Sequence, residues 1–396
     1  MNKRTARRVR WSLWCLLALI LLISCHGEAG RGDVVFHPTP DNIPTVTDPR
    51  FIINNEPQDT LSWMLAALRE GDTVGVAEGM ATDMLGSIQD IAVSDDLVYY
   101  VDRSYSHVRA YNFKGHQVDI IGGAGQGPGE FRFPMHVSTI GTEHDVYVVV
   151  GDLFASRISV FSKTPEGSHV FRTVFRAAAP LLNGDMCAMN EHVYTTGYTD
   201  ESDGVIHKHT LQGEHVLSFG ARYDHPDRFI RRKMSEGPSI ECNATHNTLL
   251  FVYPHTPIAT AFTELGDISW QIRFADARIA PKRERIGSDG GSSVMSPTPR
   301  VGESSGIRII GGSRGNTFWL THSERLSEKR DRWANHFYTV DVLSGQGKYL
   351  GIRPINVLLG EEDRRRIRVI DQERLITRRF TPYPQLGIHP VSDATR

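Results

Sequence analysis

The sequence lacks most of the short motifs that identify an enzyme. It contains no His-Glu-x-x-His zinc motif and no phosphate-binding loop of the P-loop type. Its serine, histidine and aspartate residues show no convincing catalytic triad order. We therefore assign no catalytic residue, no metal ligand and no cofactor from linear motifs.

The chain also has few cysteines and no large excess of either charge. The chain has 4 cysteines, and the two that lie beyond the N-terminal segment, Cys187 and Cys242, are too few for a closed structural zinc site. Five of the 44 basic residues lie in the first 24 positions, which hold no acid, so the rest of the chain is acidic against a total of 46 Asp and Glu. This balance gives no support to a nucleic-acid partner.

The composition is otherwise that of an ordinary globular protein. With 40% hydrophobic and 23% charged residues over 396 positions, the chain is not collagen-like, coiled-coil or largely disordered. Its 36 glycines favour many turns. A search for internal repeats therefore decides the architecture.

The N-terminus has the pattern of an export signal. Residues 1–10 are strongly basic, and residues 11–24 form an apolar run shorter than the roughly 20 residues that a membrane span needs. We predict a signal peptide over residues 1–24, with an uncleaved membrane anchor as the alternative. Residues 25–50 are rich in glycine and proline and lack hydrophobic periodicity, which predicts a flexible tether.

The end of the apolar run, Leu22-Ile23-Ser24-Cys25, resembles the bacterial lipobox. This resemblance implies that Cys25 is lipidated and becomes the N-terminus of a protein whose soluble body is tethered to a membrane. The residue that follows is a histidine rather than the aspartate that the family uses for retention in the inner membrane. We therefore expect an outer-membrane location, on the periplasmic side or at the cell surface.

From about residue 88 onward, the chain is a succession of short β-rich runs. Six apolar strand cores recur at intervals of 48, 47, 56, 69 and 57 residues, anchored at Val98, Val146, Val193, Leu249, Phe318 and Leu375. Periods of this size, each holding about four strands, are typical of propeller blades. The sequence therefore predicts an all-β fold, a six-bladed β-propeller of four-stranded antiparallel blades over residues 51–396.

The first three repeats predict their strands one by one. The expected strands are 88–93, 97–102, 107–112 and 117–121, then 135–140, 145–150, 157–161 and 170–175, then 185–188, 192–196, 205–210 and 215–219.

Two irregularities in the repeat have local explanations. Residues 281–306 are crowded with Gly, Ser and Pro, which predicts a loop inserted between blades four and five. The last repeat has room for only two or three strands, so a strand from residues 62–76 is expected to close the ring. Residues 61–68 fit a short helix equally well.

Residues 122–134, GGAGQGPGEFRFP, resemble the junction between NHL repeats, and residues 148–152 and 157–161 resemble the second and third strands of that repeat. The resemblance is to bacterial six-bladed propeller lipoproteins with NHL-like or TolB-like blades, and it weakens beyond residue 162. Glycines allow positive φ between blades, and Phe131 and Phe133 can wedge between neighbouring sheets. We interpret the segment as a structural junction, because no helix follows it as a phosphate loop requires.

Candidate ligand-binding residues are those expected on the innermost strands, six to ten positions before each anchor. They are Asp90, His136, Glu241 and Arg308, although a polar residue on an inner strand is more often part of a hydrogen-bonded channel lining.

Cys187 and Cys242 fall at nearly equivalent positions of adjacent blades. An exported protein can keep a disulfide between such a pair. Two separate buried thiols are the preferred interpretation until the distance between their Cα atoms is known to be below about 7 Å.

Three functions fit these observations, and the third, after the two described next, is a component of an outer-membrane complex. The leading hypothesis is an exported, membrane-anchored propeller that binds a protein or a small molecule at the channel face. The alternative, implied by the resemblance, is a hydrolase or lyase of the lactonase or esterase kind with a divalent metal in the channel. His207 and His209 are the most closely spaced histidines, and we interpret them as structural rather than as metal ligands.

Overall fold

The fold was analysed in a computed structural model. It describes residues 34–35, 72–80, 83–141, 145–154, 156–253, 255–274, 277–280, 282–286, 292–295, 298–311, 315–328, 332–354, 366–370, 374–379 and 383–390. The predicted signal peptide, Cys25 and the expected helix at residues 61–68 lie outside these ranges.

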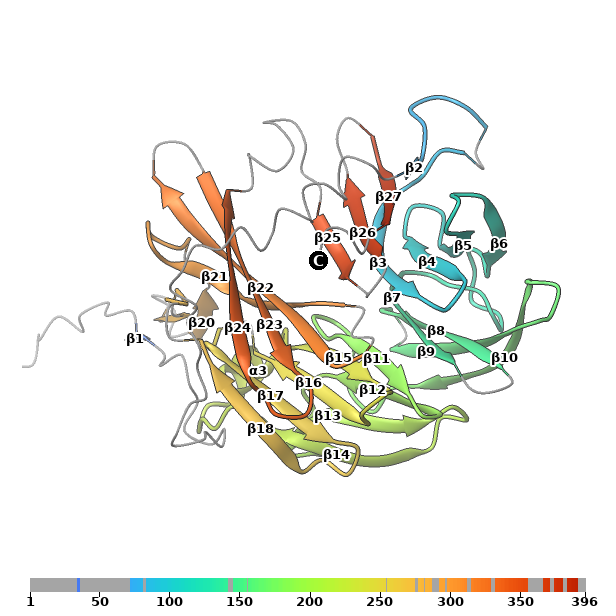
Figure 1. The fold of residues 1–396 in the computed structure, drawn as a ribbon. Helices are drawn as coiled ribbons and strands as arrows, with labels where there is room; N and C mark the ends of the chain where they lie inside the picture. Colours follow the sequence, from blue (N-terminus) through green and yellow to red (C-terminus); the bar gives the residue numbers. More distant parts are fainter. Residues whose placement is uncertain are drawn as a thin grey trace, which may run out of the picture.

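Six four-stranded antiparallel sheets form the blades of a propeller (Figure 1). The first three blades comprise β3 (Ile88–Val93), β4 (Leu97–Asp102), β5 (His107–Asn112) and β6 (Gln117–Ile121); β7 (Pro134–Gly141), β8 (Val146–Asp152), β9 (Arg157–Lys163) and β10 (His169–Arg176); and β11 (Met186–Met189), β12 (His192–Thr196), β13 (Gly204–Thr210) and β14 (His215–Ala221).

The remaining blades follow the same order from the channel outward. They comprise β15 (Ser239–Asn243), β16 (Thr248–Val252), β17 (Ile258–Thr263) and β18 (Ile268–Arg273); β21 (Ser304–Ile310), β22 (Thr317–Ser327), β23 (Arg332–Asp341) and β24 (Gly347–Pro354); and β25 (Arg366–Ile370), β26 (Arg374–Arg379), β27 (Gln385–Pro390) and β2 (Asp72–Val74).

The first strands of the blades surround the channel. β3, β7, β11, β15, β21 and β25 contact one another in this order, and β25 returns to β3. The predicted fold, a six-bladed propeller of four-stranded antiparallel blades, is therefore confirmed. All six anchor residues lie on second strands, where side chains on both faces are covered by neighbouring sheets. A strand buried on both faces needs a continuous apolar run, as β4 shows with every residue buried.

The ring closes between the two ends of the propeller. β2 pairs antiparallel with β27, with Asp72 opposite Ile388 and Val74 opposite Leu386, so the outer strand of the last blade comes from within the expected segment 62–76. Arg378 on β26 donates hydrogen bonds to the backbone oxygens of Ile88 and Gln89 at 2.9 and 2.6 Å, which ties the last blade to the first.

The glycine-rich junction between β6 and β7 packs between the first two blades. Phe131 is fully buried between the first two blades, and its backbone N–H donates to the oxygen of Gly123 at 2.7 Å. Gly122 has a φ of +74°, and a Cβ atom there would lie 2.3 Å from the Phe131 ring. Arg157 holds the loop from the second blade by donating to the backbone oxygen of Gln126 at 2.9 Å.

Two insertions leave the regular plan, and both lie beside the fourth blade. The helix α3 (Arg228–Ser235) precedes β15, and Asp227 caps its N-terminus by accepting from two backbone N–H groups. The segment 281–306, expected as an aperiodic loop, contains the antiparallel strands β19 (Arg283–Ile286) and β20 (Ser292–Met295), and its last residues begin β21.

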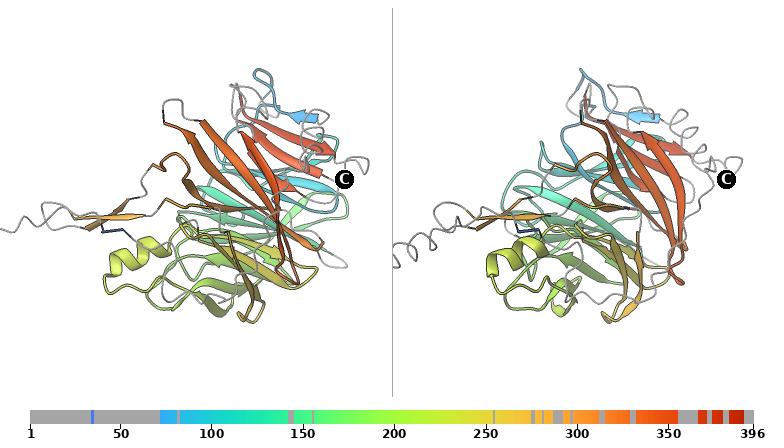
Figure 2. Two further views of the ribbon diagram at one scale, coloured as in Figure 1. Left: turned by 60° about the vertical axis from the view of Figure 1, so that its left-hand side comes forward. Right: turned by 90° about the vertical axis from the view of Figure 1, so that its left-hand side faces the viewer.

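The hairpin of β19 and β20 projects beyond the blades next to α3 (Figure 2). The short strand β1 (Val34–Val35), within the segment expected as a tether, pairs with β19. Neither β1 nor the hairpin was predicted from sequence, because their residues lack the regular apolar alternation that marks a strand. Among the residues that the structure describes, no helix is long and apolar enough to cross a membrane.

Candidate functional site

The predicted channel residues all lie on inner strands. Asp90 is on β3, His136 on β7, Glu241 on β15 and Arg308 on β21. Asp90, Glu241 and Arg308 line one cavity of about 470 Å³, which continues to the turns that follow the inner strands. His136 lies behind this lining, with its Nδ1 atom 3.7 Å from Oδ1 of Asp185. Four blades therefore bring the predicted residues to one region of the channel.

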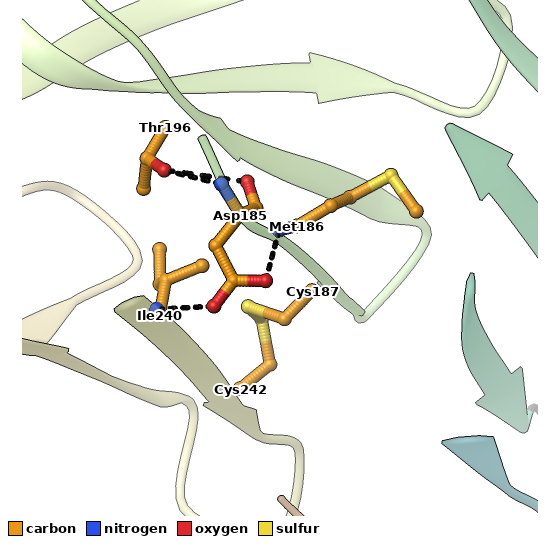
Figure 3. Close-up of a disulfide and its surroundings, with 6 residues drawn as sticks. All are labelled: Asp185, Met186, Cys187, Thr196, Ile240 and Cys242. Atoms are coloured by element: carbon orange, nitrogen blue, oxygen red, sulfur yellow. Dashed lines mark hydrogen bonds between the residues drawn. A yellow bond between two sulfur atoms is a disulfide. The ribbon is translucent and has the colours of Figure 1, made fainter. Parts of the chain in front are cut away.

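Asp185, which the sequence analysis did not select, lies at the centre of this region. Its Oδ1 accepts a hydrogen bond from the backbone N–H of Met186 at 2.9 Å, and its Oδ2 accepts from that of Ile240 at 3.1 Å. Its own backbone N–H points at the hydroxyl oxygen of Thr196 at 2.7 Å. Figure 3 shows the carboxylate between the inner strands of the third and fourth blades. One side chain thus joins two blades.

Asp90 repeats this arrangement two blades earlier. Its Oδ2 accepts from the backbone N–H of Val137, on the inner strand of the next blade, at 3.0 Å. The inner strand of each blade has a sheet partner on one side only, so N–H groups on its other edge need acceptors from elsewhere. Carboxylates of the preceding blade supply those acceptors, which gives both aspartates a structural role in the ring.

The charge of the region depends on Asp185. Burial raises the pKa of its carboxyl above the ordinary value; the neighbouring His136 opposes this shift, and the negative charge of Asp90 adds to it. The side chain is nevertheless 32% exposed, at the wall of the channel cavity. A carboxyl of this kind can exchange a proton with a bound ligand.

Cys187 and Cys242 form a disulfide in the structure, with their Cα atoms 5.5 Å apart. The preferred sequence interpretation, two separate thiols, is therefore not what the structure has. The bond joins the inner strands of the third and fourth blades beside Asp185, and both cysteines line the cavity (Figure 3). The hydrogen bond from Ile240 to Asp185 and the disulfide therefore join the same pair of strands.

His207 and His209 are placed as structural residues on β13. Both nitrogens of His207 have protein partners, the Ser218 hydroxyl at 2.8 Å and the backbone oxygen of Gly197 at 3.0 Å. Nε2 of His209 accepts from the backbone N–H of Ala178 at 3.2 Å. Burial lowers the pKa of both imidazoles, to about 4 for His209.

The structure also brings together a serine and a histidine that the sequence analysis did not single out. Residues 302–306 and 311–315 both have the spacing Gly-x-Ser-x-Gly. Ser304 Oγ lies 2.7 Å from Nδ1 of His322, whose Nε2 lies 2.9 Å from the Tyr338 hydroxyl. Ser304 is 1% exposed and is part of a strand rather than of a strand-to-helix turn, so no substrate reaches it.

Several carboxylate oxygens at the cavity already accept hydrogen bonds. Both oxygens of Asp185 and one of Asp90 accept from backbone N–H groups. Within the described part of the chain, no group of three His, Cys, Asp or Glu side chains is placed to hold a metal ion.

Comparisons with known proteins agree with the fold. No protein-family model and no curated protein matches the sequence. Among solved structures, a candidate exported protein of Bacteroides fragilis is similar with a TM-score of 0.53 and 12% identity, over 82% of this chain and 95% of that one. A DUF4221 family member from Bacteroides vulgatus has a TM-score of 0.48 and 10% identity, over 81% and 98%. A periplasmic gluconolactonase of Pseudomonas aeruginosa has a TM-score of 0.40 and 10% identity, over 77% and 86%.

Proposed function

We propose that this protein is an exported, membrane-anchored propeller that binds a small, positively charged molecule in its channel cavity. The observation that carries the proposal is the composition of the cavity wall. Asp90, Asp95, Asp185 and Glu241 contribute four carboxyl groups to the lining, against the single guanidinium of Arg308. A volume of about 470 Å³ is within the range of small-molecule sites.

The acidic lining selects the charge of the ligand. A concave site with one sign of charge concentrates counter-ions of the other sign, and its low-dielectric walls strengthen the effect. An amine that reaches Asp185 would favour the ionised carboxylate and so lower its pKa again. Polar groups of the wall, including Ser138 and Thr139 on β7, add acceptors for the N–H groups of such a ligand.

Export and anchoring belong to the same proposal. The disulfide between Cys187 and Cys242 is of the kind that persists in oxidising compartments, and the segment that ends at Cys25 has the pattern of a lipoprotein signal. The similar Bacteroides fragilis protein is itself a candidate for export. We assign the blades to the NHL-like or TolB-like class of bacterial lipoproteins, attached at the outer membrane through Cys25.

Calorimetric titration of the full-length protein in detergent tests the binding. We expect spermidine to bind and glutamate not to bind. Glu241→Gln should weaken spermidine binding by up to about fivefold, since a partly exposed ion pair contributes up to ~1 kcal/mol. Glu214→Gln, on an exposed turn of the third blade, is the matched control and should bind as the wild type does. Absence of spermidine binding, or equal effects of both variants, would refute the proposal.

An enzyme is the second candidate, and one observation favours it. His136 and Asp185 lie 3.7 Å apart beside the cavity, and two such groups can take a proton from the water that attacks a lactone or an ester and give a proton to the leaving oxygen. Metal analysis by mass spectrometry, on protein purified without chelator and without a histidine-rich tag, separates the candidates. A stoichiometric divalent ion would support a metal-dependent hydrolase, whereas the binding proposal expects none.

A further inference from the structure

A second cavity, of about 380 Å³, lies between the two insertions and the fourth blade. Its wall includes Lys233 on α3, Lys282 just before β19 and Val294 on β20. Val294 packs against the buried side chains of Ile230 and Met234 on α3, so the helix and the hairpin form one structure. The remaining wall comes from residues before β11 and β15, from the segment around the start of β21, and from His255 between β16 and β17, and none of these residues lines the channel cavity.

Positive charge in this cavity is incompletely neutralised. Glu236 forms ion pairs with Arg232 and Lys233, both at 2.9 Å. Lys282 Nζ donates to the backbone oxygen of Lys233 at 3.1 Å, and among the described residues it has no carboxylate partner within ion-pair distance. Burial lowers the pKa of Lys282 to about 8; Glu236 opposes this shift, and the charge of Lys233 adds to it. Among the described residues, the partly desolvated ammonium group therefore has no carboxylate in direct contact, and Glu236 acts on it only from a longer distance.

A buried histidine in the same wall has no hydrogen-bond partner among the described residues. His255 is 4% exposed, and neither of its ring nitrogens has a hydrogen-bond partner in the described structure. The ring packs beside Tyr253, with centroids 5.3 Å apart, and it lines the cavity. Buried polar side chains nearly always have partners, so two unsatisfied nitrogens in a cavity wall indicate a group that is supplied from outside.

We propose that this cavity binds a small organic anion, whose carboxylate or phosphate oxygens contact Lys282 and the N–H of His255. The neutral imidazole offers one donor, and the ammonium offers two protons that the Lys233 backbone oxygen does not take. Val294 and Pro299 give the wall an apolar portion that suits the body of the ligand. A hydrogen bond between a negative head group and a desolvated ammonium is stronger than one between neutral partners.

Titration calorimetry with hexanoate and with inorganic phosphate tests the proposal on the full-length protein in detergent. We expect at least one anion to bind, and Lys282→Met to weaken that binding about 10- to 100-fold, as loss of a charged hydrogen bond requires. His255→Phe should weaken it as well. Lys114→Met, which removes an exposed lysine from a turn of the first blade, should change nothing.

The two probes separate the possible head groups. Binding of hexanoate alone assigns a carboxylate ligand, and binding of phosphate alone assigns a phosphate. Binding of neither anion, or the same affinity in Lys282→Met as in Lys114→Met, would overturn the proposal. Circular dichroism of each variant separates loss of binding from loss of folding, and removal of a buried charge from Lys282 should not lower stability.

Proton uptake provides a readout that folding does not affect. At pH 8 the bound anion should raise the pKa of Lys282, so the protein should take up a fraction of a proton on binding. Repeating the calorimetric titration in buffers of different ionisation enthalpy measures this proton uptake. The other titratable groups at the cavity are Lys233 and Glu236, which are paired with each other, and His255, whose pKa burial places well below its ordinary value. Lys282→Met should take up no proton, and the absence of uptake by the wild type would contradict the role of Lys282.

Discussion

Reduction of the disulfide between Cys187 and Cys242 should destabilise the propeller by a measurable amount. The bond closes a loop of 55 residues. On the chain-entropy relation, a loop of that length restricts the unfolded chain by about 4 kcal/mol at 25 °C. Because Asp185 joins the same two strands through its hydrogen bond to Ile240, the folded geometry should survive reduction. The decrease in unfolding free energy should therefore come mainly from the greater conformational entropy of the reduced unfolded chain.

The corresponding shift in melting temperature follows from the size of the fold. An unfolding entropy of roughly 2.1 cal/mol/K per residue, over the about 320 residues from β2 to β27, amounts to about 0.7 kcal/mol/K. A loss of 4 kcal/mol therefore lowers Tm by about 6 °C.

Differential scanning calorimetry with and without a phosphine reductant measures this shift. The variant with Cys187→Ala and Cys242→Ala should melt at the temperature of the reduced wild type and should not respond to the reductant. A change below about 1 °C on reduction would refute the reasoning, as would a reductant effect of equal size in the variant. A large shift accompanied by loss of β-sheet circular dichroism at 25 °C would show that the bond is needed for the fold itself.

Three further predictions concern the ring, the junction and the anchor. Asp185→Asn should lower the unfolding free energy at pH 7 by about 1–3 kcal/mol, because one backbone N–H loses its acceptor. Since the pKa of Asp185 is raised in the folded state, the folded wild type binds more protons than the unfolded chain. Denaturant titrations from pH 4 to 8 should therefore show the stability of the wild type, relative to this variant, falling as pH rises above about 4. Gly122→Ala should destabilise the fold by about 2 kcal/mol or more in the same assay, since the φ of Gly122 is +74° and an added Cβ would overlap the buried Phe131 ring. Gly123→Ala should be neutral, because an added Cβ there would have no atom within 4 Å. Equal effects of the two substitutions would contradict this. Cys25→Ser should abolish incorporation of labelled palmitate and release the protein from membranes, and Cys15→Ser should do neither; continued labelling of Cys25→Ser would contradict a lipid on Cys25.

The blades were predictable because their signals are local. All four strands of the first blade have the bounds that their apolar runs and turns predict. The ring closure was predictable from a shortage of strands in the last repeat. By contrast, α3 and the hairpin of β19 and β20 are placed by packing against each other, through Ile230, Met234 and Val294, and this contact between distant segments, like the second cavity beside it, leaves no trace in sequence.

The channel residues were predictable from their distance to the anchors, and that rule also covers the residue that was missed. Asp185 stands eight positions before Val193, as Asp90 stands eight before Val98. An aspartate at the same offset in two repeats was a usable signal. The pairing of Cys187 with Cys242 was not decidable in this way, because it depends on a distance between two blades.

Co-crystallisation of the protein with spermidine tests the central claim most directly. The account predicts ligand density in the channel cavity, with an amine nitrogen within about 3 Å of the carboxylate of Glu241 or of Asp185. An empty cavity at saturating spermidine, or ligand bound only at surface carboxylates outside the channel, would contradict it.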